Sequence, residues 1–317
     1  MRANREVIMN KKIIYVIAMI LMGCIILYQY KKDQIVMLER IVNNNNITLW
    51  TESFGDVRNP TIVFISGAGA SSRFWTDAFI KQIVDFGYFV IRFDHRDSGL
   101  SSAVDFEKNP YTVLNLAKDV IAILDAYNIE KAHVVGHSMG GTIVQLLAIH
   151  YPQRVLSITS MSVGTVGEVA APSQETMDVL LENKPTQNFE ESLPGFMESW
   201  KLLNGNFEVD QELATEYTKD LYERSNHPVG VARNHIKAQE EFTDLSVQLK
   251  SIVVPAFFIH GQEDLLIPVQ AGIATAKVVS NAKIDVIPDM GHMIFNRELE
   301  QNLANILILN FKSVHNI

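Results

Sequence analysis

The chain has 317 residues, 47% of them hydrophobic, which suits one large domain with an insertion or two small domains. The net charge is −9 and Lys and Arg do not cluster in the body of the chain, which argues against nucleic acid as a partner. Cys24 is the single cysteine, so an intramolecular disulfide is impossible, and no CxxC or HExxH pattern suggests a zinc site.

The first predicted element is an uncharged apolar run at residues 13–30, with two lysines on each side. Eighteen helical residues span about 27 Å, close to the thickness of a bilayer core. We expect a single-pass membrane anchor that is not cleaved, followed by a linker at residues 33–46, so that residues 1–46 form a separate unit. Four basic residues before the run against three after it favour a cytoplasmic N-terminus, with the rest of the chain outside the cytoplasm.

Three alternatives for this run stay open. A buried core helix rarely extends this far without a polar face. A cleaved signal peptide normally has a shorter apolar region and an A-x-A-like cleavage site, and no such site follows here. Residues 21–24, Leu-Met-Gly-Cys, look like a bacterial lipobox, so lipid attachment at Cys24 is the third alternative, although the apolar run continues beyond the cysteine.

From Ile47 onward, short runs rich in Val, Ile and Phe alternate with segments of helical periodicity. Continuous apolar strands are typical of a parallel sheet covered on both faces, and their alternation with helices indicates βαβ units. We predict an α/β fold, a mostly parallel sheet flanked by helices, built from residues 47–164 and 250–317. The predicted strands are 61–65, 88–93, 132–135, 155–161, 253–260 and 283–287, and the predicted helices are 74–85, 113–127 and 140–150.

Residues 136–140 read Gly-His-Ser-Met-Gly, a G-x-S-x-G motif directly after a predicted strand and directly before a predicted helix. This context predicts a tight, strained turn that raises the Ser138 hydroxyl above the sheet. Small residues two positions to either side allow the turn to close. Ser138 is therefore the candidate nucleophile.

The alternation stops over residues 165–249, where helical segments are separated by prolines. We expect helices at 173–183, 189–203, 210–225 and 230–245. We interpret this stretch as a helical cap inserted over the sheet. Apolar residues such as Phe196 and Trp200 indicate a hydrophobic or aromatic-containing substrate.

A serine nucleophile needs a base, and with this motif the acid and the histidine follow the serine in that order. Asp264 lies in the loop after strand 253–260, and His292 follows strand 283–287. We predict that His292 is the base and that Asp264 holds its tautomer and stabilises the imidazolium. Glu263 and Asp289 remain alternatives for the acid, and His260 is interpreted as a structural anchor of its loop.

An oxyanion hole also requires two backbone N–H donors. The residue after the nucleophile, Met139, should provide one. The loop after strand 61–65 reads Ser-Gly-Ala-Gly-Ala, and its glycines allow N–H groups to turn inward, so Ala68 is the second candidate. Because no GxxxxGK[ST] pattern is present, we do not expect this loop to bind a nucleotide.

Taken in this order, Gly-x-Ser-x-Gly, His-Gly-x-x-Asp and Gly-His resemble the α/β-hydrolase superfamily. Residues 94–101 resemble the Asp-x-Arg-Gly-x-Gly-x-Ser loop of its cap-bearing members, with Asp97 at a position that usually holds glycine. The sequence 109–141 is similar to the aclacinomycin methylesterase group, and the oxyanion loop departs from the usual His-Gly start with Ser66-Gly67.

The resemblance implies a serine hydrolase that cleaves carboxylic esters through an acyl-enzyme, with no cofactor or metal. A C–C bond hydrolase, a peptidase or a perhydrolase with the same triad is the enzymatic alternative. A membrane-tethered binding protein without catalytic activity is the alternative from another class.

Overall fold

A computed structural model describes residues 37–183, 186–225, 231–240 and 244–315. It divides the chain into two units, Met1–Val36 and Met37–Ile317, of which the second is described below. The predicted membrane anchor and the Cys24 alternative lie outside the described residues. Within the ranges given, no helix is both long and apolar enough to cross a bilayer.

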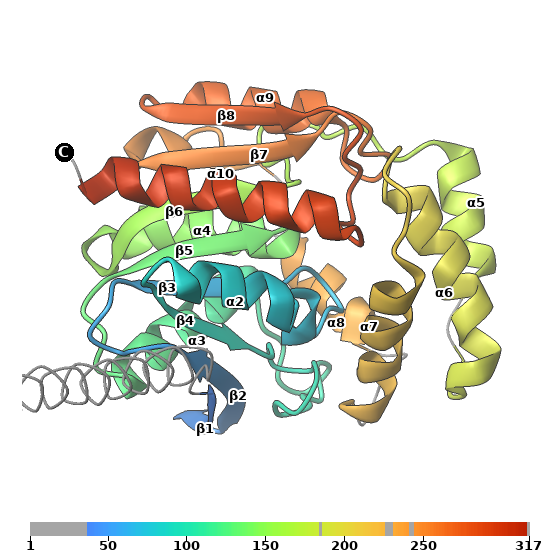
Figure 1. Cartoon of the computed structure of the whole chain (residues 1–317), viewed down its shortest axis with the longest axis horizontal. Helices are drawn as coiled ribbons and strands as arrows, with labels where there is room; N and C mark the ends of the chain where they lie inside the picture. Colours follow the sequence, from blue (N-terminus) through green and yellow to red (C-terminus); the bar gives the residue numbers. More distant parts are fainter. Residues whose placement is uncertain (1–36, 184–185, 226–230, 241–243, 316–317) are drawn as a thin grey trace, which may run out of the picture. The chain divides into compact units, whose positions relative to one another are not determined.

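An eight-stranded sheet forms the centre of the second unit (Figure 1). Its strand order is β1-β2-β4-β3-β5-β6-β7-β8, and every pairing from β4 to β8 is parallel, as predicted. The strands are β1 (Met37–Asn44), β2 (Ile47–Phe54), β3 (Thr61–Ile65), β4 (Phe89–Phe93), β5 (Ala132–His137), β6 (Val155–Met161), β7 (Ala256–Gly261) and β8 (Ala282–Ile287).

Helices cover both faces of the sheet (Figure 1). On one face lie α2 (Asp77–Asp85) and α10 (Arg297–His315), and on the other lie α3 (Val113–Ala126), α4 (Met139–His150) and α9 (Val269–Val278). Every residue of β3, β4, β5 and β7 is buried between these layers, which is why their sequences read as continuous apolar runs.

The predicted linker at residues 33–46 is wrong from Met37 onward, because β1 pairs with β2 as an antiparallel hairpin along its whole length. Residues 43 and 44 of the polar run end β1, and residues 45 and 46 form the turn of this hairpin, where Asn45 adopts a positive φ of 55°. Asparagine tolerates this conformation in tight hairpin turns. Only Val42 of β1 is buried, so the strand had little hydrophobic pattern to reveal it.

Among the described residues between β6 and β7, four α-helices lie in the predicted cap segment. They are α5 (Gln174–Glu182), α6 (Phe189–Leu203), α7 (Gln211–Glu223) and α8 (Val231–Gln239). Figure 1 shows α5, α6 and α7 beside the edge at which the parallel strands end. Polar side chains before three of them, Ser173, Asn188 and Asp210, accept hydrogen bonds from first-turn N–H groups and so define where the helices start.

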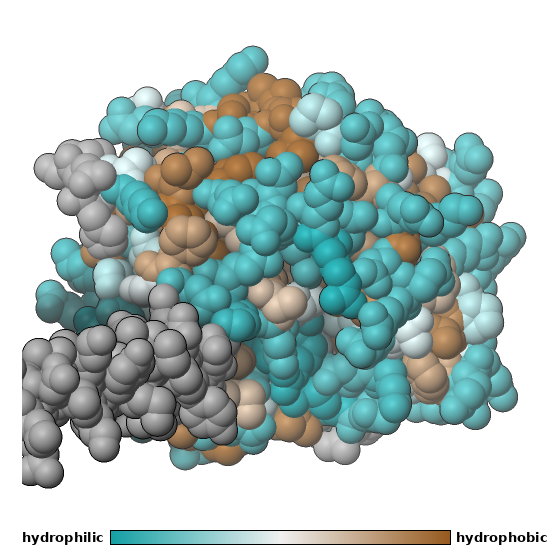
Figure 2. Space-filling model, viewed as in Figure 1, coloured by the Kyte–Doolittle hydropathy of each residue, from teal (hydrophilic) through white to brown (hydrophobic). Residues whose placement is uncertain are grey.

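The face seen in Figure 2 is mostly hydrophilic, with hydrophobic residues gathered around β7 and β8 and over parts of the cap. In β8 the burial alternates along the strand, as expected at the edge of a sheet. The apolar residues that form the main core lie instead between the sheet and its helices, where they support the strand ends that carry the site.

Candidate active site

Ser138 lies between β5 and α4 with φ 54° and ψ −120°, a conformation that is costly for any residue except glycine. Its N–H donates to the Met161 carbonyl at 2.9 Å, and its carbonyl accepts from the Gly141 N–H at 2.7 Å. These bonds tie the turn to β6 and to the first turn of α4. The predicted strained strand–turn–helix geometry is therefore present at Ser138.

The two glycines of the motif are required by close packing. A Cβ on Gly136 would lie 2.0 Å from the Gly140 carbonyl oxygen, and a Cβ on Gly140 would lie 2.3 Å from the Ile65 carbonyl oxygen. Both distances are far below van der Waals contact, and the atoms approached are backbone atoms that cannot move aside. The turn at Ser138 closes only because neither position carries a side chain.

His292 and Asp264, predicted from separate loops, are brought together at the carboxyl ends of β7 and β8. The Nδ1–H of His292 donates to Asp264 Oδ2 at 2.9 Å, and both side chains are buried. Asp264 Oδ1 accepts from the backbone N–H groups of Leu266 and Ile267 at 2.9 and 2.8 Å. This arrangement fixes one tautomer of His292, with Nε2 left as the proton acceptor.

The carboxylate of Asp264 is held in its charged form. Burial by itself would raise its pKa, but the His292 imidazole, the His260 ring, whose Nε2 lies 3.4 Å from Oδ2, and the backbone donors outweigh burial and hold the pKa well below its ordinary range. Of the two alternative acids, Asp289 is exposed and accepts from the Asn206 amide, while Glu263 is half-buried. Within the described residues, Asp264 is the carboxylate that pairs with His292.

His260 has the anchoring geometry expected of it, because its Nε2–H donates to the Ile267 carbonyl at 2.8 Å. His137 has a contact that sequence patterns missed. Its Nε2–H donates to the His292 carbonyl at 2.7 Å, 155 residues away, and burial lowers the pKa of His137 to about 3, which keeps the ring neutral. The residue before the candidate nucleophile thus positions the backbone of the candidate base.

The predicted oxyanion loop lies against the nucleophile. A Cβ on Gly67 would be 3.2 Å from the Ser138 Cβ, and Ala68 lines the same cavity as Ser138. Met139 is the first residue of α4, so its N–H has no acceptor within the helix and is free to face a ligand. The loop turns back through Gly69 at φ 73°, and the Ser66 hydroxyl donates to the Ser71 carbonyl at 3.0 Å.

The loop after β4 is held by buried side chains. Asp94 accepts from the N–H groups of Ser72 and Leu100 at 2.8 and 3.0 Å, which joins it to the end of the oxyanion loop. Asp97, at the position where glycine is usual, adopts φ 71° and accepts from the Tyr111 hydroxyl and the Val104 N–H. These bonds compensate for a backbone conformation that glycine adopts without strain.

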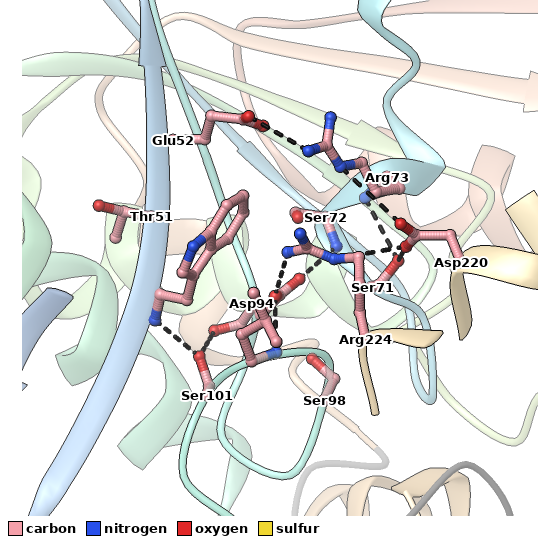
Figure 3. Close-up of polar contacts among 12 residues, drawn as sticks. Thr51, Glu52, Ser71, Ser72, Arg73, Asp94, Ser98, Ser101, Asp220 and Arg224 are labelled. Carbon is pink, nitrogen blue, oxygen red and sulfur yellow. Dashed lines mark hydrogen bonds and ion pairs between the residues drawn. The ribbon is translucent and has the colours of Figure 1, made fainter. Parts of the chain in front are cut away.

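The cap reaches this loop through Arg224, at the C-terminus of α7. Figure 3 shows its guanidinium beside Asp94, Ser71 and Asp220. The Arg224–Asp94 distance is 2.8 Å, and the guanidinium carbon lies 4.0 Å from the centre of the Trp50 ring. This ion pair joins the cap to the core next to the oxyanion loop.

Core and cap enclose a cavity of about 530 Å³ that contains Ser138 and His292. Phe196 and Trp200, predicted to face the substrate, line it, and their rings stack with centroids 5.3 Å apart. Trp200 is held from behind, because its Nε1–H donates to the Thr218 hydroxyl at 2.9 Å. The cavity can hold an apolar molecule above Ser138.

Three features of the fold and the site are typical of the α/β hydrolases as a class. They are the parallel sheet, the strained serine turn after β5, and the Asp–His pair after β7 and β8. The family described as alpha/beta hydrolase fold matches residues 60–298, and the chain belongs to this family.

Among curated relatives, the chain is 31% identical to the rhodomycin D methylesterase of Streptomyces peucetius and 32% identical to that of Streptomyces sp. strain C5. Each match covers 81% of this chain and 93% of the relative. Among solved structures, a bacterial membrane phospholipase A has a TM-score of 0.73 at 19% identity, covering 96% of this chain and 94% of that one. At that identity the likeness shows the fold alone.

We predict that Asp264→Asn lowers kcat about a thousandfold or more, because an amide can hold His292 in the wrong tautomer and cannot stabilise the imidazolium. Ester hydrolysis measured with purified full-length protein checks this. Glu263→Gln and Asp289→Asn are the matched controls and should keep kcat within about threefold of the unmodified enzyme. A loss of comparable size in Asp289→Asn alone would transfer the role of the acid to that residue.

Proposed function

We propose that this chain is a carboxylic ester hydrolase that works through an acyl-enzyme on Ser138, with His292 as base and Asp264 as its partner. The observation that carries the proposal is the cavity itself. Ser138, on a strained turn, and His292, whose Nδ1–H donates to Asp264, both line this cavity. Relatives named as methylesterases support the same reaction class.

In the proposed reaction, His292 Nε2 takes the hydroxyl proton as Ser138 Oγ attacks the ester carbonyl carbon. The negative charge moves to the carbonyl oxygen, which accepts hydrogen bonds from the N–H groups of Met139 and Ala68. Collapse of this intermediate expels the alcohol, which takes the proton from His292. A water molecule then attacks the acyl-enzyme by the same route and releases the acid, so none of these steps calls for a cofactor or a metal.

The substrate class follows from the cavity. Its lining above Ser138 is largely apolar and aromatic, which favours an ester with a hydrophobic or aromatic part. A second cavity, of about 570 Å³, also contains Ser138 and is lined by Thr142, Thr165 and Gln239 among others. Two cavities that meet at the nucleophile leave room for groups on both sides of the scissile carbonyl.

Replacement of the nucleophile tests the reaction class. Ser138→Ala should lower ester hydrolysis by about a thousandfold or more and abolish labelling by a fluorophosphonate, because the three side chains act as a unit. The unmodified enzyme is assayed in parallel on a panel of esters, lactones, amides and C–C bond substrates. Full turnover by Ser138→Ala would refute the assignment of the nucleophile, and preferred cleavage of C–C or amide bonds would refute the assignment of the reaction.

Replacement of a cap residue tests the substrate class. Trp200→Ala should lower kcat/KM for a bulky aromatic ester about tenfold or more while leaving that for the acetate of the same alcohol within about threefold, because only the larger acyl group reaches the cap. Lys201→Ala, an exposed neighbour on α6, is the matched control. Equal losses on both esters would mean that Trp200 only packs the cap.

We also propose that residues 13–30 anchor the enzyme in a membrane with residues 37–317 outside the cytoplasm. The support is the length of the uncharged apolar run and the small excess of basic residues before it. Lipid attachment at Cys24 is the alternative way in which the enzyme could be held at the outer face of the membrane. Either route would place the site near hydrophobic esters held in or close to the bilayer.

Fractionation of expressing cells tests the anchor. Carbonate-washed membranes should retain the full-length chain, because a spanning helix is not released by high pH. Protease added to intact, wall-stripped cells should digest the catalytic part. Recovery of the full-length chain in the soluble fraction would refute the anchor. Protection of the catalytic part from protease would reverse the orientation. A mature chain that begins at a lipidated Cys24 would show that the protein is held by lipid attachment and not by a spanning helix.

A further inference from the structure

Two buried histidines meet at the oxyanion loop, and the mechanism above uses neither. His95 follows β4 in the core, whereas His235 belongs to α8 of the cap. Both are fully buried, and their rings meet edge to face with centroids 5.7 Å apart. A cap residue therefore reaches the loop that provides one of the two proposed oxyanion donors.

The hydrogen bonds of this pair bracket Ala68. His95 Nε2–H donates to the Ser66 carbonyl at 3.1 Å, two residues before Ala68. His235 Nδ1 accepts from the Gly69 N–H at 3.0 Å, one residue after it. Because a backbone N–H can only donate, His235 Nδ1 carries no proton, and its Nε2–H donates to the Arg96 carbonyl at 2.8 Å. Each ring nitrogen of His235 thus makes one defined hydrogen bond, Nδ1 as the acceptor and Nε2 as the donor.

The bond from the Gly69 N–H requires the His235 ring to be neutral. Burial is the main cause that lowers the pKa of His235, and it lowers the pKa of His95 to about 3. The charged groups that act on His235 are Arg96, which lowers its pKa further, and Asp97, which opposes the shift. A neutral His235 keeps the Nδ1 lone pair available to the Gly69 N–H.

The helix that carries His235 also faces the substrate. Ile236 and Gln239, one and four residues further along α8, line the cavity above Ser138. On the other side of His235, the Asn234 amide donates to Asp97 at 3.2 Å. One short helix therefore contacts the substrate cavity, the loop after β4 and the oxyanion loop.

We infer that His235 is a positioning residue that holds the oxyanion loop in its working geometry and links the cap to transition-state stabilisation. The inference rests on the proposed ester hydrolysis. Through the Gly69 N–H, His235 holds the Ala68–Gly69 peptide group, and His95 holds the Ser66–Gly67 peptide group through the Ser66 carbonyl. The Gly67–Ala68 peptide, which carries the Ala68 N–H, lies between these two fixed groups, so His235 limits the direction of that N–H. A substrate that packs against α8 stabilises the same helix that aligns the donor.

Three replacements separate the contribution of the Gly69 hydrogen bond of His235 from that of its Arg96 hydrogen bond. In His235→Asn, the amide oxygen takes the place of Nδ1 and keeps an acceptor for the Gly69 N–H. In His235→Gln, the amide nitrogen takes the place of Nε2, so the Arg96 contact is kept and the Gly69 acceptor is lost. His235→Phe keeps the ring and loses both bonds. Lys237→Gln, which removes the 2.6 Å ion pair of α8 with Glu107, is the matched control on the same helix.

Kinetics of the full-length variants on an aromatic ester are the measurement. We expect His235→Gln and His235→Phe to lower kcat about tenfold or more with KM within about threefold, a part of the effect of losing an oxyanion donor. The inhibition constant of a matched trifluoromethyl ketone, which forms an oxyanion on the serine, should rise in step with the loss in kcat/KM. His235→Asn and Lys237→Gln should keep kcat within about threefold.

Thermal unfolding of each variant separates positioning from a loss of fold. If His235→Phe fails to fold, the comparison of His235→Asn with His235→Gln decides alone. Equal kcat in these two variants, or a loss confined to KM, would overturn the role of His235. If the unmodified enzyme hydrolyses no ester, the proposed function fails instead, so the two failures are distinguishable.

Discussion

The backbone of Ser138 is the constraint on which the site depends. A positive φ at a residue with a side chain costs on the order of 1–3 kcal/mol, and the neighbouring structure has to over-determine it. Bonds to Met161 and Gly141 do so, together with the close approach of Gly136 and Gly140. Because α4 starts at the next residue, the same turn raises the hydroxyl and presents the first N–H of the helix.

Around this turn, burial and hydrogen bonding divide the histidines into two kinds. His95, His137 and His235 are buried, and the desolvation lowers their pKa values and keeps the rings neutral. Each donates a hydrogen bond to a backbone carbonyl and so supports a loop. His292 differs because its Nδ1–H meets the carboxylate of Asp264. This contact fixes the ring orientation and leaves Nε2 as the acceptor, as the proposed role of base requires.

The cap is joined to the core by polar contacts that specify its position. Arg224 and Asp94, 130 residues apart, form an ion pair in which the aspartate is fully buried (Figure 3). Removal of two charges from water is costly, so the pair adds little net stability, whereas loss of either partner would leave the other charge buried without compensation. The Asp94 carboxylate recovers part of this cost through the N–H groups of Ser72 and Leu100. Cap position and oxyanion loop are thereby coupled through the same carboxylate.

The sequence by itself determined the parallel core, the turn at Ser138 and the order along the chain in which Asp264 and His292 follow it. Local patterns carry these features, because buried strands, glycines at fixed spacing and loops at strand ends are short-range signals. Only the tertiary structure decided that β1 continues the sheet, since Val42 alone of its residues is buried. It also decided that His137 supports His292 and that His235 reaches Gly69, because these bonds join residues 155 and 166 positions apart and leave no trace in any local pattern.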